Sequence, residues 1–220
     1  MTFPKQRVRR RTALVGAAAG VLLVLLTLAV VLRSGRPFGW DSALHAWCLD
    51  VRTPGLVRAA RILTASGTGV PAYVLAAAAG ALGGGRRWWA GALVAVGTIG
   101  AVQLLRLALA TAIGRPRPPA MDWATTASGA AYPSGHSTTS AAVAVVVVVA
   151  VVLRWSSRAV RATVAVLALG WAAGVGLTRV YLGVHWPSDV LGGWLLIAAL
   201  ASIVAAARVG LGRRASHVTR

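Results

Sequence analysis

Six long apolar segments follow one another along the chain and predict membrane-spanning helices. Each has close to the roughly 20 residues that cross a hydrocarbon core. Arg106 interrupts the third segment, and the fourth and fifth reach full length only if their polar flanks join the helix. The pattern predicts an all-α, polytopic membrane protein, a six-transmembrane-helix bundle, with spans at 13–32, 62–84, 88–113, 137–153, 162–178 and 189–207.

Two segments have alternative interpretations. Residues 1–32 could be a signal peptide, but the apolar run is too long and no small-x-small cleavage site follows, so an uncleaved first helix is favoured. Residues 41–61 are too polar to span, yet Leu44, Trp47 or Cys48, and Val51 recur at helical spacing. This segment is either an amphipathic helix in the outer interface or a packed connector.

Composition agrees with a membrane protein and excludes a water-soluble globule. Of the 220 residues 57% are hydrophobic and 12% charged, and the mean hydropathy is +0.72. The net charge of +19 comes from 22 arginines and one lysine against four aspartates. These bases form short clusters between apolar runs, which is typical of orientation signals and anionic headgroup contacts and argues against nucleic acid as a partner. A single cysteine, Cys48, permits no internal disulfide and fits no metal-ligand spacing.

The distribution of bases predicts the orientation. Alternate loops and the two termini hold 14 Lys and Arg, whereas the other loops hold 8. By the positive-inside rule both termini are cytoplasmic, in a multi-pass protein of the cell membrane. We expect a basic tail at 1–12, the helical domain at 13–208 and a second basic tail at 209–220.

Three polar stretches lie at the predicted outer ends of spans three to six, so they can converge on one face. They are GRPRPP (114–119), YPSGHS (132–137) and TRVYLGVHWPSD (178–189). Each has a simple structural explanation when taken alone. The prolines can stop a helix, Ser134 can cap one, and His136 can be an interfacial histidine. The four-residue spacing of His185 and Asp189 would let the carboxylate hold one imidazole nitrogen.

Together these stretches contain the groups that phosphoryl transfer needs. The guanidinium group of arginine binds two phosphoryl oxygens at once. Gly135 has no side chain, so its backbone can approach a phosphoryl group closely. A helix N-terminus adds N–H donors for an anion. An imidazole oriented by a carboxylate is a competent nucleophile, and a second imidazole can protonate the departing oxygen.

The order and spacing of these residues resemble the type 2 phosphatidic acid phosphatase superfamily. Its signature is Lys-x6-Arg-Pro, then Pro-Ser-Gly-His, then Ser-Arg-x5-His-x3-Asp. Here Arg117-Pro118, Pro133 to His136, and Thr178-Arg179 with His185 and Asp189 match it. The chain departs from it at Ala110, where the lysine should stand, and at Thr178, which keeps the hydroxyl of serine. Arg106, one turn from Ala110, is the nearest base on that segment.

The resemblance implies a role for each matching residue. His185 would attack phosphorus, Asp189 would hold its tautomer, and His136 would protonate the leaving group and then activate water. The phosphoryl oxygens would be held by Arg117, Ser134, Gly135, Arg179 and, in place of the lysine, Arg106. No metal or other cofactor is implied, and four acids would make a poor magnesium site.

Two functions remain open at this point. The first is a lipid phosphate phosphatase with its active site on the extracytoplasmic side, acting on phosphatidic acid, a phosphatidylglycerol phosphate or a polyprenyl pyrophosphate such as undecaprenyl pyrophosphate. Polyprenyl carriers are slightly favoured by what is known of the family. The alternative is a noncatalytic protein that binds or translocates anionic lipids, for which Ala110 argues. A related vanadate-dependent haloperoxidase is disfavoured by the small, mostly spanning chain. The sequence does not indicate an oligomeric state.

Overall fold

Helices make up the regular structure in the computed structural model, which describes the backbone of residues 3–218 and the side chains of residues 11–205. No strand occurs in that part of the chain, so the all-α prediction is confirmed. The side chains of the predicted basic tails lie almost entirely outside the described residues. The elements are α1 (Phe3–Leu32), α2 (Gly39–Asp50), α3 (Pro54–Ser66), α4 (Gly69–Gly84), the 3-10 helix η1 (Gly85–Arg87), α5 (Trp88–Ile113), the 3-10 helix η2 (Ala120–Asp122), α6 (Gly135–Arg154), α7 (Arg158–Tyr181) and α8 (Pro187–Val218).

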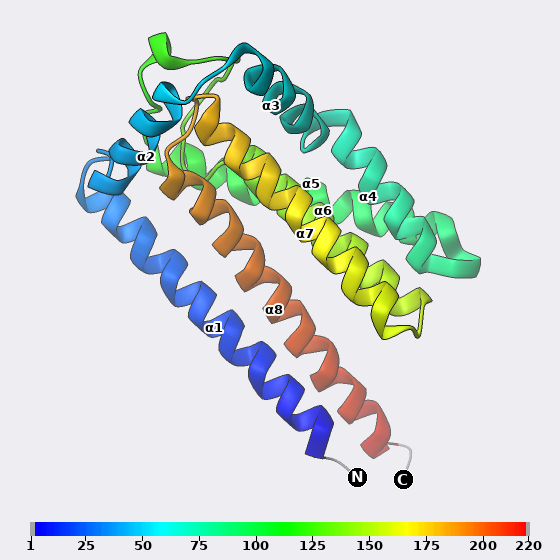
Figure 1. The fold of residues 1–220 in the computed structure, drawn as a ribbon. Helices are drawn as coiled ribbons and strands as arrows, with labels where there is room; N and C mark the ends of the chain where they lie inside the picture. The colour runs from blue at the N-terminus through cyan, green and yellow to red at the C-terminus, as the bar shows by residue number, and fades with distance from the viewer. Residues whose placement is uncertain (1–2, 219–220) are drawn as a thin grey trace.

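Five stretches of the described chain are long and apolar enough to cross a membrane. They are Arg11–Leu32, Gly69–Ile113, Gly135–Arg154, Arg158–Tyr181 and Pro187–Ala205. The second stretch contains both α4 and α5, which fold back on each other at η1 (Figure 1). At Gly80 and Gly91 the two backbones touch so closely that a Cβ on either glycine would collide with the carbonyl of the other. Small residues at helix contacts permit this close packing in membranes.

The predicted span at 62–84 is wrong at its start. Residues up to Ser66 belong to α3, and the helix breaks at Gly67 and Thr68 before α4 begins. Gly67 lies against Val175 of α7, whose side chain would collide with a Cβ there, and Gly69 has a φ of +58°. The sequence is apolar on both sides of this break, so the apolar pattern alone could not locate it.

The interfacial segment predicted at 41–61 forms two helices rather than one. Helix α2 ends at Asp50, and Thr53 caps α3 by accepting a hydrogen bond from the Leu56 amide at 3.3 Å. Leu44, Trp47 and Val51 are exposed, whereas Asp41, His45 and Cys48 are buried. The packed face of α2 therefore carries polar groups, and the apolar face that the sequence predicted points away from the protein.

Polar flanks extend α6 and α7 beyond their apolar runs, as their full length requires. Helix α6 includes Ser137, Thr138, Thr139 and Ser140, all fully buried. Thr138 and Thr139 donate to carbonyls one turn earlier in the helix, each at 2.8 Å, and Ser140 donates to the Ala172 carbonyl of α7 at 3.3 Å. These hydroxyls make helix-entry and interhelical contacts, which satisfies them away from water.

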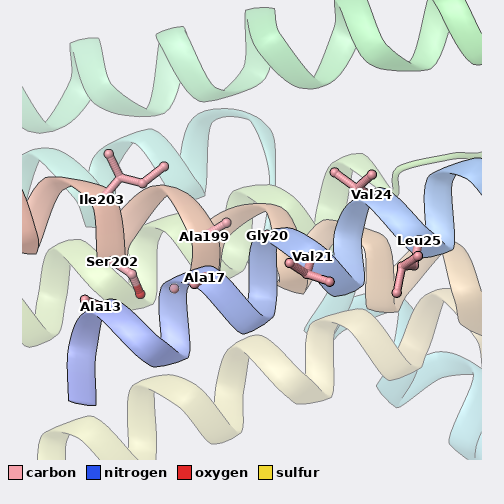
Figure 2. Close-up of a pocket in the computed structure, with 10 residues that line it drawn as sticks. Ala13, Ala17, Gly20, Val21, Val24, Leu25, Ala199, Ser202 and Ile203 are labelled. Carbon is pink, nitrogen blue, oxygen red and sulfur yellow. The ribbon is translucent and has the colours of Figure 1, made fainter. Parts of the chain in front are cut away.

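The apolar core lies where α4, α5, α6 and α8 meet. Its buried members are mostly alanine with larger aliphatic side chains between them: Ala72, Ala76, Ala95, Ile99, Ala142, Val143 and Ile197. An open apolar groove of about 610 Å³ lies between α1 and α8, lined by residues such as Ala17, Gly20 and Ala199 (Figure 2). Its α8 lining starts ten residues beyond Asp189, so it lies roughly 15 Å along the helix from the polar motifs.

The polar motifs gather at one end of the bundle. Figure 1 shows α2, α3 and the loops after α5 and α7 at that end, while both termini lie at the opposite end. The turns after α4 and α6 also point away from the polar loops (Figure 1). The convergence that the sequence predicted for the three motifs is therefore present in the fold.

Candidate active site

His185 lies in a tight connection between α7 and α8. Helix α7 closes with the Leu182 amide donating to the Thr178 carbonyl at 2.8 Å, and Gly183 follows with a φ of +77°. A side chain at position 183 would collide with the Asp122 carbonyl, so the turn requires glycine. Pro187 then begins α8, which places His185 just before the helix and Asp189 in its first turn.

The two nitrogens of His185 face different partners. Nδ1 lies 3.4 Å from Asp189 Oδ2, and Nε2 lies 2.9 Å from a terminal guanidinium nitrogen of Arg117. Because arginine can only donate, Nε2 must accept and therefore carries a lone pair. The proton then sits on Nδ1, directed at the carboxylate. This is the tautomer in which Nε2 can act as a nucleophile.

Burial keeps the imidazole of His185 neutral. The residue is 2% exposed, and burial lowers its pKa from 6.5 to about 4, although the hydrogen bond and charge of Asp189 partly oppose that change. The positive charges of Arg117 and Arg179 lower the same pKa further. At neutral pH Nε2 therefore keeps its lone pair, which accepts the hydrogen bond from Arg117.

Backbone carbonyls of the loop before α6 and of the connection before α8 hold the Arg117 guanidinium. It donates to the carbonyls of Ser128 at 2.8 Å, Gly129 at 2.9 Å and Val184 at 2.7 Å, besides its contact with His185. Burial lowers the pKa of Arg117; the charge of Asp189 raises it and that of Arg106 lowers it. The guanidinium is held where a group bound at Nε2 would meet it.

Two further guanidinium groups have N–H groups without partners. Arg179 is 3% exposed and donates to the Thr64 hydroxyl at 3.0 Å, while its Nε is buried and makes no hydrogen bond. Arg106 also has a buried, unpartnered Nε. Its guanidinium lies beside Gly135, where an added Cβ would come within 3.5 Å of Arg106 Cζ. Arg106 therefore points into the predicted site. Ala110, at the lysine position of the motif, is buried, with 2% of its surface exposed.

The start of α6 is tied directly to the start of α8. Ser134 occupies the N-cap position, but its side chain makes no capping bond and instead accepts a hydrogen bond from Ser137 at 3.0 Å. The Ser134 amide donates to the Asp189 carbonyl at 3.0 Å. Gly193 of α8 lies against this turn so closely that a Cβ would come within 3.1 Å of the Ser134 carbonyl. This packing places the N-terminus of α6 next to the histidine and its carboxylate.

His136 is half-buried one residue into α6. The guanidinium groups of Arg179, Arg117 and Arg106 lie close enough for their charges to act on its imidazole. The structure thus brings the predicted residues to one place, with direct bonds among Arg117, His185 and Asp189. The Arg179 guanidinium makes its hydrogen bond to Thr64 of α3, which is not one of the predicted residues.

Sequence reasoning missed a buried ionic cluster behind Asp189. Arg115 donates to Asp189 at 2.5 Å, to Asp41 at 2.9 Å and to Ser188 at 2.7 Å. Arg115 is 1% exposed and both aspartates are fully buried. Arg115 lies in the GRPRPP stretch, but its spacing does not match the arginine of the motif. The scarcity of acids was the available signal, because a buried aspartate among 23 bases needs a cationic partner.

The helical bundle is that of a multi-pass membrane protein, and its polar end gathers arginines around a histidine. Residues 91–213, more than half of the chain, match the family model of the PAP2 superfamily, and the chain belongs to that superfamily. This confirms the resemblance drawn from the three motifs.

One solved structure is similar over nearly all of the fold. It is described as the crystal structure of the first transmembrane PAP2-type phosphatidylglycerolphosphate phosphatase from Bacillus subtilis. The two chains are 26% identical, with a TM-score of 0.73, over 88% of this chain and 96% of that chain. No curated protein matches the sequence significantly.

Proposed function

We propose that the protein is an integral membrane phosphatase that hydrolyses lipid phosphates through a phosphohistidine intermediate. The observation that carries this is the state of His185, which is neutral, oriented by Asp189 and directed through Nε2 at Arg117. Membership of the PAP2 superfamily supports phosphatase chemistry, and the similar Bacillus subtilis protein is described as a phosphatase of a phospholipid. The catalytic unit would be residues 13–208.

In the first step His185 Nε2 forms a bond to phosphorus. The bond from phosphorus to the leaving oxygen breaks, its electron pair goes to that oxygen, and His136 supplies the proton. Asp189 stabilises the positive charge on the phosphorylated ring through the Nδ1 proton. In the second step water attacks phosphorus and gives a proton to His136. The P–N bond then breaks, its electron pair returns to Nε2, and inorganic phosphate leaves.

The phosphoryl oxygens would be held by Arg117, Arg179, Ser134 and the Gly135 amide. Fixed donors of this kind commonly supply the largest share of the rate enhancement. We assign Arg106 to the place of the family lysine, because its guanidinium lies beside Gly135 and its buried Nε has no other partner. An incoming phosphoryl group would take the Arg117 N–H from His185 and so release the Nε2 lone pair.

We also propose six spans, with both termini in the cytoplasm and the site at the outer surface. Helices α4 and α5 fold back on each other, so the long apolar stretch would cross twice, although α4 has 16 residues and covers only about 24 Å. The count of basic residues supports this orientation. A lipid could then present its phosphate to the polar end while its tail stays between helices and bilayer.

Cysteine labelling on intact cells tests the orientation. Thr126→Cys, in the exposed part of the loop between α5 and α6, should react with an impermeant thiol reagent when Cys48 is replaced by alanine. The matched control is Ser156→Cys in the turn between α6 and α7, which should react only after permeabilisation. The reverse pattern would show that the site faces the cytoplasm.

Phosphate release by detergent-purified protein tests the function itself. The panel is phosphatidic acid, phosphatidylglycerol phosphate and undecaprenyl pyrophosphate, each with and without a chelator. We expect release from at least one lipid, unaffected by the chelator, because guanidinium groups rather than a metal would hold the phosphate. Phosphatidylglycerol phosphate is the first choice on the similarity to the Bacillus subtilis protein. Tight lipid binding without release would favour the noncatalytic alternative, for which the loss of the lysine at Ala110 is the supporting observation.

A further inference from the structure

We infer that Asp41 of α2 is a positioning residue for the reaction, acting through Arg115 on the carboxylate that orients His185. The inference rests on the proposed function. Asp41 lies 50 residues before the segment that matches the family model and belongs to none of the three motifs. It is nevertheless fully buried and in direct contact with the start of α8.

Each oxygen of Asp189 has a separate task. Oδ1 accepts from Arg115 at 2.5 Å, while Oδ2 accepts from the Trp186 amide at 2.8 Å and faces His185 Nδ1 at 3.4 Å. Arg115 therefore sets the rotation of the carboxylate, since its bond to Oδ1 leaves Oδ2 directed at the histidine. A loosely held carboxylate would let the imidazole exchange its tautomer.

Asp41 in turn fixes Arg115. Its Oδ2 accepts from the Arg115 guanidinium at 2.9 Å and from the Ser188 hydroxyl at 2.6 Å, and its Oδ1 accepts from the Ser188 amide at 2.9 Å. The Gly35 carbonyl holds Arg115 Nε at 3.2 Å. Each of the three guanidinium nitrogens thus has a hydrogen-bond partner in a fully buried site, where such bonds are strong.

Asp41 also balances charge. Arg115 alone would neutralise Asp189, which must keep a negative charge to stabilise the cationic phosphohistidine. With Asp41 present, one ionised arginine and two ionised aspartates leave one net negative charge beside the ring. Removing Asp41 would leave Arg115 to act on Asp189 uncompensated, so the imidazolium would lose stabilisation as it forms.

Asp41→Asn tests this with the full-length protein in detergent. The kcat on the best lipid of the panel should fall about 10- to 100-fold, as is usual for a residue behind a catalytic group, with KM within about twofold because the phosphate ligands are untouched. Asp50→Asn is the matched control, since Asp50 is exposed at the end of the same helix. Ser188→Ala should cause a smaller fall in kcat, because it weakens the hold on Asp41 without changing any charge.

Nitrogen-15 NMR of histidine-labelled protein provides a readout that does not depend on activity. The His185 signals are assigned by their loss in His185→Gln, and in the parent protein they should report a proton on Nδ1. In Asp41→Asn, or in Ser188→Ala if the first variant does not fold, the signals should indicate exchange between the two tautomers. An unchanged His185 spectrum in a folded variant overturns the proposal, as does an unchanged kcat in an active enzyme. If the parent releases no phosphate from any lipid, the proposed function fails while the spectrum still decides the role of Asp41.

Discussion

The four arginines around His185 and Asp189 fall into two clusters that differ in what surrounds them. Arg115 lies between Asp41 and Asp189 and forms salt bridges with both. Arg106, Arg117 and Arg179 form no salt bridge with any carboxylate in the part of the chain that the structure describes. Their hydrogen bonds go to backbone carbonyls, to the Thr64 hydroxyl and to His185, and two buried Nε groups have no partner.

The difference separates an arginine with carboxylate partners from arginines that we propose to bind phosphate. Burying a guanidinium without a counter-ion costs free energy, so it persists only where the rest of the fold supports it. Two of the four acids in the chain are placed around Arg115, while none pairs with the other three arginines. A phosphate dianion would supply the missing negative charge. This unpaired cluster of Arg106, Arg117 and Arg179 therefore indicates the proposed phosphate site more sharply than the number of arginines in the motifs.

His185→Ala should cause the largest loss, because it removes the proposed nucleophile next to the unpaired cluster. We expect turnover to fall on the order of 10⁶-fold, as when a nucleophile is deleted from a catalytic unit. Asp189→Asn should cost less, on the order of 10⁴-fold, since the nucleophile remains but loses its oriented tautomer. The measurement is initial phosphate release, together with acid-labile phosphate trapped on the parent and absent from His185→Ala. Full activity of His185→Ala would end the phosphohistidine scheme.

Arg106→Ala tests whether the third member of the unpaired cluster binds phosphate. Removing one donor to the transition state should lower kcat/KM on the order of a hundredfold. Arg58→Ala is the control, because Arg58 is exposed on α3. Adding Ala110→Lys to Arg106→Ala should recover much of the loss by restoring the family lysine.

Equal rates for Arg106→Ala and the parent would mean that Arg106 does not compensate for Ala110. If instead the parent is inactive and Ala110→Lys alone starts hydrolysis, the noncatalytic function is favoured. Ala110 is buried, so the recovered protein must first be shown to be folded by its thermal unfolding.

The sequence predicted the helical membrane fold and the contact of His185 with Asp189 because both depend on local pattern. Hydropathy marks the spans, and a spacing of four residues brings His185 to Asp189. It could not place the break at Gly67, since the cause is a contact with Val175 on a distant helix. It also predicted the apolar face of α2 but not that the opposite, polar face is the one packed inward.

The Arg115 cluster was missed for a related reason. Arg115 and Arg117 are both arginines of one RPRP run, and nothing local distinguishes the residue that pairs with carboxylates from the one beside His185. The contact of Arg115 with Asp41, on a helix outside the family-matched segment, separates the two environments. By contrast, the sequence could suggest Arg106 as a phosphate ligand, because alanine replaces the motif lysine at position 110 and Arg106 lies one helical turn away.

Thr64→Val tests a smaller feature of the unpaired cluster, the neutral oxygen that fixes Arg179. The change keeps the side-chain volume but removes the acceptor at 3.0 Å from Arg179. Losing a single hydrogen bond of this kind should raise KM about threefold to tenfold and leave kcat nearly unchanged. Thr98→Val is the matched control, because Thr98 is exposed and bonds to its own helix. A KM equal to that of the parent would mean that Arg179 is positioned without Thr64.

The smallest expected effect is the response of activity to mild acid, which follows from the burial of His185. Its pKa of about 4 in the folded protein is below the ordinary value of 6.5, so the imidazole stays neutral and nucleophilic as the pH falls from 7 to 5. The acid limb of kcat/KM that belongs to the enzyme should therefore lie near pH 4, with activity halved there. The pH profile of kcat/KM is measured on phosphatidylglycerol phosphate and on undecaprenyl pyrophosphate. Titration of the substrate phosphates differs between the two lipids, so a decline at the same pH with both belongs to the enzyme. A common limb near pH 6.5 would contradict a buried neutral His185.

The same pKa difference predicts how stability depends on pH. Between pH 6.5 and 4 the unfolded chain binds the extra proton, so the contribution of His185 to stability is present above pH 6.5 and is lost as the pH falls toward 4. A thermal unfolding temperature that falls over this range in the parent, and falls less in His185→Gln, would link the stability change to the same imidazole.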